Sequence, residues 1–246
     1  MWHKISSAVK KYFPDLLVFL MCVSLFLVLF FRFVPVPGTL LMVKRLVTSS
    51  SDDQLSYSWT SWHNIAPFPK VCAMASEDQM LPFHHGLDIS SLVDALQSNG
   101  KKRLRGASTI SQQVAKNVFL YPTRSFIRKG FELYFAFMIE SLWTKQRILE
   151  VYLNIAETGD KTFGVDAAAN KYFKKDAGSL ALRESALIIA SLPNPIKYKV
   201  SAPGSYLKKR QNQISSLYRS LDGQYYLREL YVKTESSLYD FSAYKQ

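Results

Sequence analysis

The sequence contains very little cysteine: only Cys22 and Cys72 among 246 residues. Two cysteines cannot build the disulfide framework of a small secreted protein. Cys22 also lies within an apolar segment, which disfavours a bridge to Cys72. The sequence has no cysteine and histidine spacing typical of a zinc site. A disulfide-stapled scaffold and a zinc-binding module are therefore excluded.

Acidic residues are also scarce relative to basic ones. The chain has 19 Asp and Glu against 31 Lys and Arg, which gives a formal net charge of +12. Such an excess predicts an anionic partner: nucleic acid, a phospholipid surface or a phosphorylated ligand. The hydrophobic share of 48% excludes a disordered or collagen-like chain and is sufficient for a buried core.

Alternating strand patterns of useful length and internal repeats are both missing from the sequence. Apolar residues recur instead at helical spacing, and a long apolar run over 131–139 indicates a buried helix. The expected helices are 127–143, a helix capped by Thr144, 165–173, 182–192 and 206–221, and the segment 154–164 with its two glycines is expected to be a loop. The sequence therefore predicts a mainly α fold.

One long apolar stretch, 16–34, is present near the N-terminus. Its length is at the short end of what crosses a hydrocarbon core of roughly 30 Å. Lys4, Lys10 and Lys11 precede it, and only Arg32 lies near its other end, so the positive-inside rule places the N-terminus in the cytoplasm. We expect an uncleaved membrane anchor; a cleaved signal peptide and a buried core helix are the alternatives.

These patterns divide the chain into five parts. We expect a cytoplasmic stub over 1–15, the anchor over 16–34, a connector over 35–64, the main domain over 65–222 and a tyrosine-rich tail over 223–246. The main domain would then lie outside the cytoplasmic membrane, where nucleic acid is not the expected anion.

The first polar cluster is Glu77-Asp78, followed by His84 and Gly86. Adjacent acids are as often a solvated helix start as a functional pair. Neighbouring histidines could bind a metal, but the spacing of a helical metal motif is absent, which favours structural histidines. On its own, the cluster leaves both readings open.

The second cluster is rich in hydroxyl and amide groups and follows a basic run over 101–105. It contains Ser108, Thr109, Gln113, Lys116 and Asn117. Donors of this kind suit phosphates or sugar hydroxyls, but the glycine and lysine spacing of a P-loop is absent. A polar helix start is the structural alternative.

The third cluster contains Arg124, Arg128, Lys129 and Glu132. Glu132 leads into a strongly apolar segment, where a carboxylate must be paired or used. A structural ion pair with the nearby cations therefore competes with a catalytic role. A fourth region, 145–154, ends at Asn154 and read alone indicates helix packing.

In this order and spacing, the clusters resemble the motifs of the peptidoglycan glycosyltransferases, glycosyltransferase family 51. The resemblance also includes 148–154, 164–173 and 192–195, and it runs from about residue 67 to about residue 217. Five ordered motifs are more specific than any one of them. The sequence departs from the family at Leu81, where an aromatic residue is usual, and at Ala107, where glycine is common.

The resemblance implies a lysozyme-like helical fold with a small membrane-associated lobe. It implies that lipid II is joined, with inversion and through β-1,4 linkages, to a glycan strand on polyprenyl pyrophosphate, without transpeptidase activity. Glu77 would be the general base and Glu132 would assist near the pyrophosphate. The other residues that the resemblance assigns are the substrate-binding Ser108, Thr109, Gln113, Lys116, Arg124, Arg128 and Lys129, and the supporting Asp78, His84, Gly86, Asn117 and Asn154.

The resemblance also bears on cofactors, partners and location. It implies no obligatory cofactor, although a divalent cation, Mg or Mn, could bind at Glu132. The expected partners are lipid-linked glycans, the membrane and other cell-wall synthesis or division proteins, and no nucleic acid. The expected location is the inner membrane of a bacterium, with the main domain outside the cytoplasm.

Two rival functions remain open from the sequence. A membrane-anchored lysozyme-like hydrolase would also use two carboxylates, but its substrate would not need cations that bind phosphate. An inactive cell-wall scaffold would be favoured if Glu77 or Glu132 were missing, and both are present.

Overall fold

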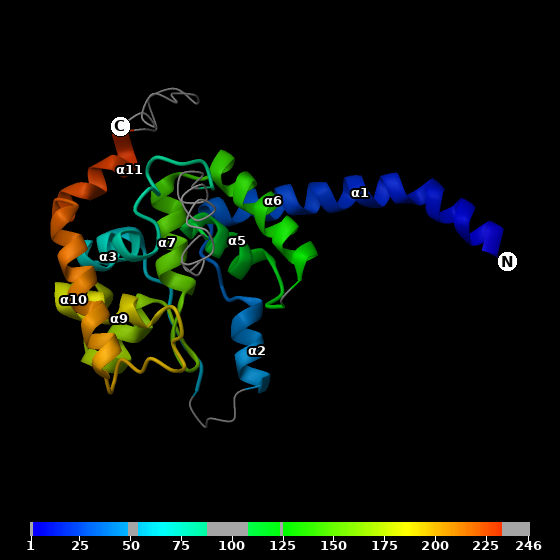
Figure 1. The fold of residues 1–246 in the computed structure, drawn as a ribbon. Helices are drawn as coiled ribbons and strands as arrows, with labels where there is room; N and C mark the ends of the chain where they lie inside the picture. The colour runs from blue at the N-terminus through cyan, green and yellow to red at the C-terminus, as the bar shows by residue number, and fades with distance from the viewer. Residues whose placement is uncertain (1, 49–53, 88–107, 124, 233–246) are drawn as a thin grey trace, which may run out of the picture. The chain divides into compact units, whose positions relative to one another are not determined.

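The computed structural model describes residues 2–48, 54–87, 108–123 and 125–232 (Figure 1). The chain separates into two compact units, Met1–Pro35 and Val36–Gln246. The second unit therefore includes the expected connector from residue 36 onward and the described part of the expected tail.

The first unit is a single helix, α1 (Trp2–Phe33). Its segment Tyr12–Phe33 has a mean hydropathy of 2.7 over a window of membrane-spanning length. By length and composition, this helix can cross a membrane. Pro14 lies inside it, before the most apolar part.

The second unit is mostly helical, which confirms the expected fold class. Its α-helices are α2 (Leu40–Thr48), α3 (Pro67–Glu77), α5 (Ile110–Phe119), α6 (Phe126–Leu142), α7 (Lys145–Ile155), α8 (Val165–Phe173), α9 (Leu182–Ser191), α10 (Ser205–Ser220) and α11 (Glu229–Val232). Short 3₁₀ turns lie at Trp62–Asn64, Ala177–Ser179 and Gly223–Arg228. The helices expected from apolar spacing are all present, with ends within about two residues of those expected.

Hydroxyl side chains fix where three of these helices begin. Thr109 caps α5, Ser125 caps α6 and Thr144 caps α7, and each accepts a hydrogen bond from a backbone N–H in the first turn. Such caps contribute about 1 kcal/mol each. The cap expected at Thr144 is confirmed.

The expected loop at 154–164 is wrong in part, because the segment forms a hairpin. Strands β2 (Glu157–Gly159) and β3 (Thr162–Phe163) are antiparallel, and β1 (Ser56–Tyr57) pairs in parallel with β3. The sheet order is β1-β3-β2. Strands of two or three residues are too short to show an alternating pattern, so the sequence could not reveal them.

Helix α7 provides much of the core of the second unit. Ile148, Leu149, Tyr152 and Leu153 are fully buried on it, and it contacts α3 and α5. Helices α3, α9 and α10 pack against one another, and α5 also packs against α6 (Figure 1). Leu81 is fully buried. The ends of α3 and α5 thus lie on a packed core.

Helix α6 is not the buried helix that its apolar run predicted. Phe126 is 99% exposed and Phe137 69% exposed, whereas Glu132 is only 3% exposed. The apolar run supports a helix but carries no information on which face meets the core. The helix therefore turns its carboxylate inward and its aromatic residues outward.

We predict that Gly164→Ala destabilises the second unit. Gly164 has φ +84°, and a Cβ there would lie 2.5 Å from the carbonyl oxygen of Asn154. We expect a loss of about 2–4 kcal/mol in the free energy of unfolding, measured by denaturant titration. Gly130→Ala is the matched control: a Cβ at Gly130 meets nothing within 4 Å, so this helical change should stabilise by about 0.5–1 kcal/mol. Equal free energies of unfolding for the two variants would contradict the conclusion that the backbone at Gly164 requires glycine.

Candidate active site

Glu77 is the last residue of α3, and its side chain is half-buried. Ser76 Oγ donates to Glu77 Oε1 over 3.1 Å, and Gln113 Nε2 donates to Glu77 Oε2 over 3.2 Å. Each carboxylate oxygen thus accepts one hydrogen bond and keeps acceptor capacity for another. The alternative of a solvated helix start is wrong, because the helix ends at Glu77 rather than beginning there.

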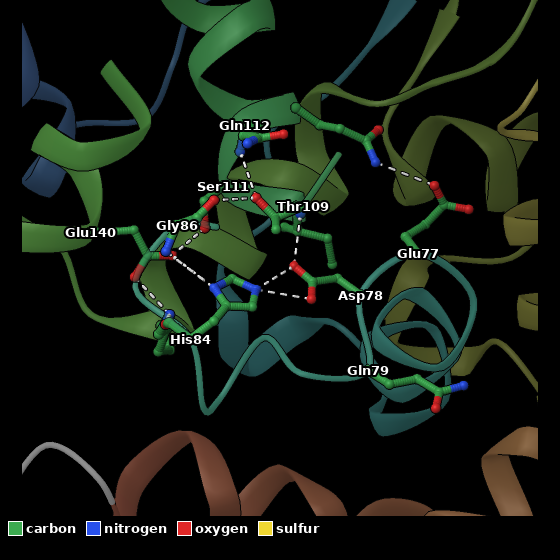
Figure 2. Close-up of polar contacts among 12 residues, drawn as sticks. Glu77, Asp78, Gln79, His84, Gly86, Thr109, Ser111, Gln112 and Glu140 are labelled. Carbon is green, nitrogen blue, oxygen red and sulfur yellow. Dashed lines mark hydrogen bonds and ion pairs between the residues drawn. The ribbon is translucent and has the colours of Figure 1, made fainter. Parts of the chain in front are cut away.

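Asp78 faces inward and joins three segments of the chain (Figure 2). Its Oδ2 accepts a hydrogen bond from the backbone N–H of Ile110 over 2.9 Å, and both of its oxygens lie 2.9 Å from His84 Nε2. Gly86 N–H donates to His84 Nδ1 over 3.1 Å, so the imidazole carries its proton on Nε2. Both ring nitrogens are engaged within the protein, which gives His84 a structural role.

Two charged residues that the sequence did not single out extend this network. The Lys145 ammonium lies 2.6 Å from Glu140 Oε2 and donates to the carbonyl oxygen of His84. Ser111 Oγ donates to Glu140 Oε1 (Figure 2). The available signal was the spacing of Glu140 from Glu132, since residues eight apart lie on one face of a helix.

The loop that carries His84 is also tied to the start of α5. Thr109 Oγ donates to the carbonyl oxygen of Gly86 over 2.7 Å and accepts from the N–H of Gln112 over 3.2 Å. Thr109 was expected to bind substrate, and the structure places its hydroxyl in the helix cap. Gln113, also expected to bind substrate, is placed by the structure against Glu77.

A second charged cluster surrounds the buried carboxylate of Glu132. Arg128 Nη1 lies 2.8 Å from Glu132 Oε2, and Lys129 Nζ lies 2.5 Å from Glu132 Oε1. Lys129 Nζ also reaches Ser108 Oγ at 3.4 Å and Gln112 Oε1 at 3.5 Å. The structure therefore brings the second and third sequence clusters together. Within the described part of the chain, the buried Nε of Arg128 has no hydrogen-bond partner.

The charge of Lys116 interacts with both carboxylates, Glu77 and Glu132. Burial lowers the pKa of Lys116; attraction to Glu132 and Glu77 opposes that effect, and repulsion from Arg128 and Lys129 reinforces it. The protein alone therefore compensates this ammonium group incompletely. A site with three cations and two carboxylates is suited to hold an additional anion.

The remaining expected site residues fall elsewhere. Asn154 is buried in α7, where its side chain exchanges hydrogen bonds with the backbone of Thr60 at 2.7 and 2.9 Å. It therefore holds the connector against α7. Asn117 is half-buried on α5. Arg124 and the basic run over 101–105 lie outside the described residues.

The arrangement around Glu132 does not fit a divalent cation. Both of its carboxylate oxygens are already paired with positively charged nitrogens, whereas Mg²⁺ needs free oxygen ligands. Among the residues that the structure describes, no group of three His, Cys, Asp or Glu side chains is placed to hold a metal ion. The expected possibility of Mg or Mn at Glu132 is thus not supported by this donor set.

Comparison with known proteins follows the same segment of the chain. Residues 44–218 match the sequence profile of the family described as Transglycosylase. The chain is 45% identical over 228 residues, 91% of its length and 98% of the relative's, to a biosynthetic peptidoglycan transglycosylase of Pseudomonas aeruginosa. It is 45% identical over 208 residues, 82% of its length and 86% of the relative's, to a protein of the same name from Yersinia pseudotuberculosis.

We predict opposite effects on stability for two lysines of this site. Lys116→Met should raise the melting temperature, because it removes a charge that burial disfavours. Lys129→Met should lower it, because Glu132 loses one of its two partners in a buried position. Both are measured by thermal unfolding of the full chain in detergent at neutral pH.

The pH dependence gives a further check on Lys116. Its lowered pKa means that the charged form costs stability at low and neutral pH. That cost falls as the pH rises through the folded-state pKa, and it is gone above the ordinary lysine value of about 10.4. The advantage of Lys116→Met should shrink accordingly. If Lys116→Met melted at a lower temperature than the unchanged protein at neutral pH, the conclusion that the buried charge of Lys116 costs stability would be contradicted.

Proposed function

The chain belongs to the transglycosylase family, and from this membership we propose how its site works. The protein is a peptidoglycan glycosyltransferase that polymerises glycan strands. We propose that the donor is a glycan strand on polyprenyl pyrophosphate, that the acceptor is lipid II, and that the protein has no transpeptidase activity. Inversion at the anomeric carbon is part of the same proposal.

Glu77 is the proposed general base. Its two oxygens accept hydrogen bonds from Ser76 and Gln113, which fix the carboxylate and leave lone pairs for a further proton. Glu77 takes the proton of the acceptor sugar's 4-hydroxyl while that oxygen attacks the anomeric carbon of the donor. The new carbon–oxygen bond forms as the bond to the pyrophosphate oxygen breaks. The pyrophosphate leaves with the electron pair.

The cations support the departure of pyrophosphate, and Lys116 is the observation that carries this proposal. Burial disfavours its charge, and the attraction of Glu77 and Glu132 offsets this only in part, so an anion would stabilise it. The Nε of Arg128, for which the described residues provide no hydrogen-bond partner, is a second donor for such a ligand. Lys129 reaches Ser108, so these two side chains border the same position. We propose Arg124 as a further phosphate contact from the sequence resemblance.

Glu132 has a different role from the acid of a hydrolase. A glycosidase acid must be protonated before it can give its proton to a leaving sugar. Both oxygens of Glu132 instead face cations, at 2.8 and 2.5 Å. We propose that Glu132 holds Arg128 and Lys129 in place for the pyrophosphate. No step of the proposed reaction passes through a metal ion.

The apolar faces of the second unit support work at a membrane surface. Exposed apolar side chains on α6 and α2 are Phe126, Ile127, Phe131, Phe137, Leu40, Val43, Leu46 and Val47. Helix α2 contacts α5, and α5 contacts α6. Large exposed apolar patches mark interaction sites, and both substrates carry lipid chains. We propose an inner-membrane protein with a cytoplasmic N-terminus, anchored by α1.

We predict that Glu77→Gln abolishes polymerisation while the fold persists. The amide keeps the shape of the side chain but cannot take a proton, so we expect kcat to fall at least about 10²-fold. The assay is incubation of the full-length protein in detergent with labelled lipid II, followed by separation of the glycan products by size.

Glu184→Gln is the control for this experiment. Glu184 lies on α9 and pairs with Lys175, outside the charged clusters described above. Its replacement should leave kcat close to that of the unchanged protein. Near-normal turnover by a folded Glu77→Gln variant would remove Glu77 from the role of base.

A further inference from the structure

Arg210 of α10 reaches the end of α3, 134 residues earlier in the chain. Its Nη2 lies 3.1 Å from Ser76 Oγ and 3.3 Å from the carbonyl oxygen of Ser76. Helices α10 and α3 pack against each other. The guanidinium group therefore holds both the backbone and the side chain of the residue that precedes Glu77.

The hydroxyl of Ser76 connects this contact to the carboxylate. A hydroxyl has one proton to donate and lone pairs to accept, whereas a guanidinium can only donate. Arg210 therefore occupies the acceptor side of Ser76 Oγ, and the single hydroxyl proton is directed to Glu77 Oε1, 3.1 Å away. The direction of both hydrogen bonds is thus set by the chemistry of Arg210.

We infer that Arg210 is a positioning residue for Glu77 and acts through Ser76. This inference rests on the proposed role of Glu77 as general base. With Gln113 on the opposite oxygen, the carboxylate is held from two sides. A base must lie within hydrogen-bond reach of the proton it takes, and a displacement of about 1 Å can cost about 10²-fold in rate.

The backbone that follows Glu77 is also held by a residue distant in sequence, and this contact can be compared with that of Arg210. Tyr226, in the 3₁₀ turn Gly223–Arg228, donates its hydroxyl to the carbonyl oxygen of Gln79 over 2.5 Å. This contact holds the backbone two residues after Glu77, but it ends at a carbonyl oxygen. Tyr226 therefore separates the effect of holding the turn from the effect of orienting the carboxylate.

The test is a double-mutant cycle on the full-length protein in detergent with labelled lipid II. We expect Arg210→Ala and Ser76→Ala each to lower kcat about 10-fold with little change in KM, because neither residue touches substrate in this account. We call the hydrogen bonds from Arg210 to Ser76 and from Ser76 to Glu77 the relay. The double variant should lose no more kcat than the Ser76→Ala variant, because either single change already interrupts the relay. Ser76→Thr keeps the hydroxyl and should retain most of kcat.

Two controls accompany the cycle. Tyr226→Phe should lower the melting temperature and leave kcat unchanged. Lys209→Ala removes a positive charge from the exposed neighbouring position on α10 and should also leave kcat unchanged. Thermal unfolding of each variant shows whether it is folded at the assay temperature, and Arg210→Lys provides a milder change if Arg210→Ala does not fold.

Several results would overturn the relay. These are losses that multiply in the double variant, a rise in KM for Arg210→Ala that Ser76→Ala does not share, or a loss of kcat in Tyr226→Phe as large as in Arg210→Ala. The proposed base is judged separately, by Glu77→Gln. If Glu77→Gln is inactive while the two single losses multiply, the relay fails and the role of Glu77 stands.

Discussion

The buried carboxylate of Asp78 is the interaction on which the rest of the site depends. It accepts a hydrogen bond from the first N–H of α5 and one from His84, so it joins the end of α3 to the start of α5. Glu77 precedes it on α3, and Gln113 and Lys116 follow on α5. Loss of the hydrogen bonds to a buried carboxylate is costly. Asp78 therefore holds Glu77, the proposed base, in a fixed position relative to Lys116, a proposed phosphate contact.

The charge pattern of the site favours transfer over hydrolysis. Arg128 and Lys129 neutralise Glu132, and the burial of Lys116 leaves it incompletely compensated. These features leave both oxygens of Glu132 engaged in ion pairs and suit the site to receive an anion. Helix α6 could serve both parts of a lipid-linked substrate. Its inner face carries Glu132, which pairs with the cations proposed to bind pyrophosphate, and its outer face carries exposed aromatic residues that suit a lipid surface. Fold alone would not decide between the two reactions.

Sequence reasoning predicted α6, α7, α8, α9 and α10 and the charged clusters, because apolar spacing and local motifs are properties of the chain itself. It did not predict that α6 exposes Phe126 and Phe137, because a nearly continuous apolar run has no distinct apolar face that would identify the side toward the core. It missed the strands, which are too short to show alternation. It also missed Arg210 and Lys145, since contacts of Arg210 with Ser76 and of Lys145 with His84 join segments distant in sequence. The contacts of Thr109 and Gln113 could be assigned only from the structure. A hydroxyl can cap a helix, and an amide can donate to a carboxylate, as readily as either can bind a substrate.

The most direct test is to identify the products that the purified, full-length protein forms from two substrates, lipid II and mature peptidoglycan. Lipid II should give polymer together with free polyprenyl pyrophosphate, and mature peptidoglycan without lipid should remain uncut, because we propose that the site stabilises a departing pyrophosphate. Glu77→Gln should stop the first reaction. Release of soluble disaccharide-peptides from purified sacculi, lost in Glu77→Gln, would contradict the account and identify the site as hydrolytic.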